Sequence, residues 1–159
     1  MARGRPLDAT QELLEEFERG GRVTEYLIGR IPARLWQQPP VSEGRTIAAI
    51  VAHIHSVRKT FGKMGGASTA PSLDRKTVSP AEAKRALRTT NDALTSLFRD
   101  SLARGEARVR GLPRRTVNMM LYLTQHDAHH RGQLMLRLRE FGHDLSGEDV
   151  MKVWGWKKV

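Results

Sequence analysis

Three histidines stand close together between Gln125 and Gln133, in a stretch whose apolar pattern predicts one long helix. His126 and His130 are four residues apart, so they lie on the same helix face, one turn from each other. Two imidazoles at this spacing are the helical half of many metal sites, because both rings can reach one ion. His129 points partly off this face. We interpret it as a neighbour of the ligands, a proton donor at the rim of the site, or an exposed side chain.

A second histidine pair, His53 and His55, stands far away in the sequence on another amphipathic stretch. His53 borders the apolar stripe of that stretch, whereas His55 lies about 200° round the helix, nearer the polar side. If the two stretches pack together, we expect His53 to be the third ligand beside His126 and His130. Three neutral imidazoles suit zinc, nickel, iron(II), manganese or copper, and they leave a coordination position for water or a substrate atom.

Three further side chains near these histidines are candidates for supporting roles. Gln133 lies two turns beyond His126 on nearly the same side, where it can hydrogen-bond a bound water or a ligand ring. Tyr122 precedes His126 by one turn; it could bring a hydroxyl near the site, but a partly buried aromatic is the simpler interpretation. Asp127 points about 100° away from His126, so we expect a surface carboxylate that pairs with Arg131. A buried histidine that is only hydrogen-bonded remains the alternative to each metal ligand.

Four helices, predicted from apolar periodicity between loops rich in proline and glycine, would carry these side chains. They span about residues 8–31, 46–62, 79–104 and 116–141. Gly20 and Gly21 weaken the first helix unless close packing against a neighbour requires them. Ser79 and Glu82 form a capping box that marks the start of the third helix.

The predicted fold is an all-α four-helix bundle in a single domain over residues 1–159, with its core at about 8–142 and a tail at 143–159. His126 and His130 interrupt the apolar seam of the last long helix, so we expect both rings to be buried. The tail contains Trp154 and Trp156, which would either cover the bundle or meet a second subunit.

The composition excludes several classes of protein. Without cysteine, the chain has no disulfide, thiolate metal site or cysteine nucleophile. The segment Met1 to Asp8 lacks the apolar run of a secretory signal, and no apolar stretch is long enough for a membrane span, so we expect a cytoplasmic protein. The net charge is +10, but the basic residues are spread along the chain without interleaved aromatics. This favours a solvated basic surface over a nucleic-acid-binding module.

The segments Thr46–Ile54 and His126–Leu134 resemble those of the DinB/YfiT-like superfamily of metal-binding four-helix bundles. The order of parts is similar as well: a long first helix, a Trp-containing linker, a helix with a histidine, a long loop and a late helix with His-x-x-x-His-Arg-Gly-Gln. The resemblance covers roughly residues 8–142, and the late motif is its most specific part.

The resemblance implies an up-down-down-up bundle, frequent homodimers, and metal-ligand positions at His53, His126 and His130. Zinc or nickel is the expected ion, with iron and manganese as alternatives. Some relatives are thiol S-transferases that use low-molecular-weight thiols such as bacillithiol or mycothiol, and others are isomerases or hydrolases. We therefore expect a metal-dependent thiol S-transferase or hydrolase, in which His129, Tyr122 or Gln133 would orient the substrate. The alternatives are a non-enzymatic metal-binding bundle with a structural or sensing role, and a basic nucleic-acid or anion-binding module.

Overall fold

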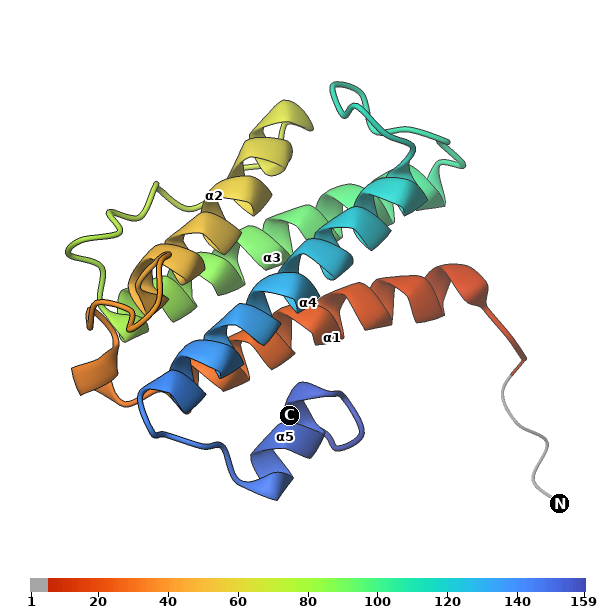
Figure 1. The fold of residues 1–159 in the computed structure, drawn as a ribbon. Coiled ribbons are helices and arrows are strands. Elements are labelled where there is room, and N and C mark those ends of the chain that lie inside the picture. Colours follow the sequence, from red (N-terminus) through yellow and green to blue (C-terminus); the bar gives the residue numbers. More distant parts are fainter. Residues whose placement is uncertain (1–5) are drawn as a thin grey trace, which may run out of the picture.

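The computed structural model describes residues 6–159, and all of its regular secondary structure over this range is helical (Figure 1). Four long helices carry most of the chain: α1 (Ala9–Gly29), α2 (Ile47–Met64), α3 (Pro80–Ala103) and α4 (Thr116–Glu140). Two short helices complete the fold: the 3-10 helix η1 (Ala33–Leu35) and α5 (Gly147–Val153). The predicted all-α class is confirmed. Residues 1–5 lie outside the described residues. They belong to the segment Met1 to Asp8, for which the sequence predicts no secretory signal.

Each long helix packs mainly against two others. Both α1 and α2 contact α3 and α4, while α3 and α4 touch each other less. In Figure 1, α1 and α4 run in one direction across the molecule, and α2 and α3 run in the opposite direction. The tail is not outside the packed structure, because α5 lies against α1, Val153 is buried, and the Tyr26 hydroxyl donates to the Asp149 carboxylate. Within residues 6–159, no helix combines the length and the apolar character that crossing a bilayer requires.

Local side-chain contacts fix where the helices begin and end. The Thr46 hydroxyl accepts from the amide of Ala49 at 3.2 Å, which starts α2 two turns before His53. The predicted capping box is present, because the Ser79 hydroxyl accepts from the amide of Glu82 and the Glu82 carboxylate accepts from the amide of Ser79. These caps place the side chains of each helix at defined positions along its axis.

A polar layer divides the core into two apolar halves. One half contains Leu27, Ile50, Leu87 and Leu134, and the other contains Phe17, Phe61, Leu94 and Leu123. Between the two halves, each long helix contributes polar or small residues, and most of them are buried: Gly20, Gly21 and Thr24 of α1; His55 and Arg58 of α2; Thr90 and Asn91 of α3; Asp127 and His130 of α4. The predicted histidine cluster therefore lies at the level where the apolar packing is interrupted.

Helix α1 continues unbroken through Gly20 and Gly21. A Cβ atom on Gly21 would lie 2.6 Å from the Asn91 side chain, whereas a Cβ on Gly20 would meet nothing within 4 Å. Close packing against a neighbour is therefore the physical reason for Gly21, and α3 is that neighbour.

Replacing Gly21 with alanine should lower the free energy of unfolding by about 1–3 kcal/mol, because Asn91 is hydrogen-bonded to Arg58 and cannot easily move away. The matched control is Gly20→Ala, one residue earlier, which should raise the free energy of unfolding by up to about 1 kcal/mol. Urea denaturation followed by circular dichroism measures both changes. Equal effects of the two substitutions would contradict the close approach.

Candidate metal centre

Three imidazole rings from α2 and α4 converge on one point. The Nε2 atoms of His126 and His130 are 3.1 Å apart, and those of His126 and His53 are 3.4 Å apart. One ring nitrogen from each of the three histidines lies within 4.8 Å of the others. Two nitrogens bound to one tetrahedral ion, each at about 2.0–2.1 Å, are separated by about 3.3–3.4 Å. The three histidines could therefore hold a single divalent metal ion.

The other ring nitrogens of the two α4 histidines decide which atoms carry protons. Nδ1 of His130 is 2.8 Å from the carbonyl Oε1 of Gln133, which only accepts hydrogen bonds, so this Nδ1 carries the proton. Nδ1 of His126 faces the Oδ1 atom of Asp127 at 3.3 Å, a longer contact with the same consequence. Both Nε2 atoms then present lone pairs toward each other across 3.1 Å, an arrangement that repels unless a cation lies between them. The donor set fits a metal ion on this ground.

The surroundings favour the neutral forms of His53 and His130. Burial lowers the pKa of His53, and the charge of Arg45 lowers it further. Burial also lowers the pKa of His130, against the opposing effect of the hydrogen bond to Gln133. Neutral rings keep their lone pairs available for a metal ion at a pH where an ordinary histidine is partly protonated.

One side of the cluster is open. His130 is buried as predicted, but His53 is only partly buried and the side chain of His126 keeps 12% of its exposure. Among the described residues, no further histidine or carboxylate joins the group of three. A four-coordinate ion held there would keep one position for water or a substrate atom, as catalytic sites do and closed structural sites do not.

The surface position predicted for Asp127 is wrong. Its side chain is 1% exposed, and one carboxylate oxygen accepts from Nε and Nη2 of Arg58 at 2.8 and 2.6 Å. Burial opposes ionisation of Asp127, but the charge of Arg58 and the hydrogen bonds from His126 and Arg58 outweigh it and lower the pKa of this carboxyl group. Arg58 also donates to the side-chain oxygen of Asn91 on α3. The predicted partner Arg131 donates instead to α1, at the carbonyl of Gly20 and the hydroxyl of Thr24.

The three residues expected to orient the substrate, Gln133, His129 and Tyr122, take different positions. Gln133 accepts from His130 and donates through its amide to Nε2 of His129 at 3.1 Å. The exposed His129 also contacts His130 directly, with the two ring centroids 5.0 Å apart. Tyr122 is partly buried, with its ring centroid 6.0 Å from that of His126 and its edge against Phe61.

His55 does not face the polar side, contrary to the prediction. Its ring is fully buried, and Nε2 lies 3.1 Å from the hydroxyl of Thr90 on α3. Burial, with smaller contributions from the charges of Lys59 and Arg58, lowers the pKa of His55 to about 4. His55 is therefore a neutral core histidine that packs on α3, away from the cluster on the α4 side.

The predicted site lacks three features of the structure: Arg58, Asn91 and the burial of Asp127. The sequence spacing does contain a signal for Arg58 and Asp127. Arg58 follows the core residue Ile54 by four positions, which places it on the same buried face of α2. Asp127 follows Leu123 by four positions and therefore lies on the apolar seam of α4. Two opposite charges on two buried faces predict an ion pair, since such charges are rarely buried alone.

Comparison with known proteins identifies the family of the chain. The DinB family model matches residues 6–154, so the chain belongs to the DinB family. A crystal structure of a protein from Exiguobacterium sibiricum 255-15, described as a candidate member of the same family, is similar in fold. It has a TM-score of 0.59 and 21% sequence identity, over 90% of this chain and 99% of that chain. No match is found among curated proteins.

Replacing Arg58 with leucine should lower the free energy of unfolding of the metal-free protein by about 3–5 kcal/mol, because Asp127 is left buried without its partner. The double variant Arg58→Leu/Asp127→Leu should recover much of this loss, since no unpaired charge remains. The control Arg104→Leu, which breaks an exposed pair with Glu106, should change it by less than about 1 kcal/mol. Chemical denaturation measures all three. A double variant no more stable than Arg58→Leu alone would contradict the coupling.

Proposed function

We propose that this DinB family protein is a metal-dependent enzyme that binds one divalent ion through His53, His126 and His130. Zinc or nickel is the preferred ion, with iron and manganese as alternatives. The observation that carries the proposal is the pair of Nε2 lone pairs 3.1 Å apart, each fixed by a hydrogen bond at the opposite nitrogen of its ring. Such an ion would lower the pKa of a coordinated water or thiol and make it a nucleophile at neutral pH.

The residues of the chain would prepare the site for that chemistry. Gln133 and Asp127 hold the rings of His130 and His126 in the orientation that directs Nε2 to the centre. His129 is exposed and linked to His130 through Gln133, so it is the candidate to exchange protons with solvent. Tyr122 covers one side of His126 and would exclude water there.

The proposed reaction is transfer of a low-molecular-weight thiol, or hydrolysis. The open coordination position supports either one, because both need a small nucleophile at the metal.

The second candidate is a non-enzymatic bundle in which the ion stabilises the fold. This candidate is supported by the polar layer, which joins the ligands to all four long helices. A fourth protein ligand in a metal-bound structure would favour it.

We also propose the up-down-down-up bundle, a single domain and a cytoplasmic homodimer. The opposite directions of α1 and α4 relative to α2 and α3 support the bundle order. Trp154 and Trp156 are 64% and 76% exposed, so neither covers the bundle, and they offer aromatic surface of the kind that subunits bury. Light scattering of the purified protein tests the dimer.

Replacing His126 with alanine should abolish metal binding, because both short contacts between ring nitrogens involve His126 and are lost. Mass spectrometry of the dialysed protein should find about one ion per chain in the wild type and none in the variant. His143→Ala, which removes a histidine outside the cluster, should retain the ion. Thiol-transfer or hydrolase activity should disappear together with the metal. Stoichiometric metal in His126→Ala would refute the assignment.

Replacing Gln133 with alanine should weaken metal binding about 10–100-fold without unfolding the protein, because the acceptor that orients His130 is lost. Competition with a chelator measures the affinity. Gln125→Ala removes an exposed glutamine from the same helix and serves as the matched control. Identical affinities of the two variants would show that Gln133 does not position the ligand.

A further inference from the structure

Two cavities share a wall beside the histidine cluster. The first has a volume of about 430 Å³ and is lined by Gln133 and by the apolar side chains of Ile50 and Leu136, among others. The second has a volume of about 380 Å³ and extends along the beginning of α2 toward the loop before α3. Gly44 and Arg45 line both. Each volume is within the range of small-molecule sites.

Both cavities reach residues next to the proposed ligands. Gln133, in the wall of the first cavity, accepts the hydrogen bond from His130. Ala49, in the wall of the second, precedes His53 by one turn on the same face of α2. Each cavity is therefore lined by a residue within about one helical turn of a proposed ligand.

The second cavity is strongly basic. Its lining contains Arg45, Arg75 and Lys76 and no carboxylate side chain. None of the three forms an ion pair within residues 6–159. The nearest acidic side chains in sequence are Glu43, which lines the first cavity, and Asp74, which accepts from the amide of Lys76. Three cations around one cavity repel one another and attract an anion.

Neither the first cavity nor a third, larger one has a comparable group of cations without acidic partners. Arg137, in the first cavity, is already bonded to Ser42, Glu140 and the carbonyl of Glu43. A larger cavity of about 740 Å³ lies between the loop before α3 and α3 itself, but its lining mixes Asp74 and Glu82 with Arg85. Arg45 is thus the cation that links an unneutralised basic pocket to the metal centre.

We propose that the pocket formed by Arg45, Arg75 and Lys76 binds the carboxylate or phosphate group of a small anionic substrate whose reactive atom reaches His53, His126 and His130. This inference rests on the proposed function and names its substrate class. The planar guanidinium of Arg45 can bind two oxygens of either group at once. Ile50 and Leu136 would contact the carbon chain between the anionic group and the reactive atom.

The first experiment uses the metal-free protein, so that the pocket is tested without the ion. Succinate and inorganic phosphate are titrated separately while NMR follows the amides of Gly44, Thr46 and Ala49. Saturable shifts are expected, and the anion that causes them distinguishes a carboxylate site from a phosphate site. Arg45→Gln should weaken this binding about tenfold or more.

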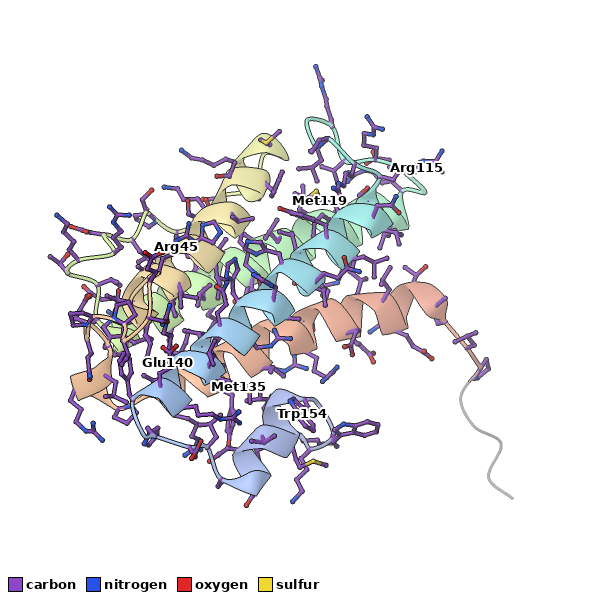
Figure 2. All side chains as sticks on the ribbon, in the orientation of Figure 1. Arg45, Arg115, Met119, Met135, Glu140 and Trp154 are labelled. Atoms are coloured by element: carbon purple, nitrogen blue, oxygen red, sulfur yellow. The ribbon has the colours of Figure 1, made fainter. Side chains whose placement is uncertain are left out.

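The control is Arg115→Gln, which makes the same charge change at the opposite end of the molecule from Arg45 (Figure 2). It should leave anion binding unchanged. Absence of shifts with both anions, or an equal loss in the two variants, would overturn the pocket.

The second experiment loads the protein with cobalt(II) and compares 3-mercaptopropionate with the uncharged 3-mercapto-1-propanol. Absorption from the thiolate bound to cobalt reports coordination. The wild type should bind the charged thiol about tenfold more tightly, and Arg45→Gln should lose this preference while binding the neutral thiol equally well. Equal affinities in the wild type would overturn the link between pocket and centre. Retained anion binding in a protein that takes up no cobalt would refute the proposed function instead.

Discussion

The buried ion pair between Arg58 of α2 and Asp127 of α4 joins the two helices that carry the histidines. Both side chains are at most 2% exposed, and removing each charge from water costs several kcal/mol. The pair is tolerated because direct contacts replace the lost hydration: two nitrogens of Arg58 reach Asp127, a third reaches Asn91, and the guanidinium lies 5.4 Å from the ring centroid of Phe17. Gly21 provides the space that Asn91 needs to take part. One polar contact set therefore includes all four long helices.

This polar layer also sets the geometry of the histidine cluster. Apolar side chains tolerate small slips between helices, but an ion pair with fixed hydrogen bonds does not. A slip of α2 along α4 by one turn, about 5.4 Å, would separate Arg58 from Asp127 and His53 from His126 at the same time. We infer that the interaction with the largest solvation cost is retained because it fixes the register in which the three Nε2 atoms meet. Asp127 then has two roles: one carboxylate oxygen pairs with Arg58, and the other faces Nδ1 of His126.

The features that could be predicted from sequence are local ones. The capping box at Ser79 and the i, i+4 pair of His126 and His130 depend only on neighbours within one turn, and the structure contains both geometries. His55 and Asp127 were not predictable in this way. Helix α2 packs on α3 and on α4, so it has two buried faces, and a residue about 200° from one apolar stripe enters the other. Asp127 has a potential partner four residues away, but its actual partner is 69 residues distant. That pairing is indicated only when the buried faces of two helices are considered together, not by the neighbours of Asp127 within one turn.

Membership of the DinB family is consistent with the helical fold, but a fold does not determine a reaction. Three imidazoles and an open position would activate many nucleophiles equally well, so selectivity has to come from the side chains around that position. The side chains proposed to supply it belong to connecting segments: Arg45 precedes α2, while Arg75 and Lys76 precede α3. Connections can change without replacing the contacts among Arg58, Asn91, Asp127 and His126, because all four of these residues lie on helices. In the proposed enzyme, the helices would hold the ligands in a fixed arrangement, and the charge of the connections would determine which molecules are brought to them.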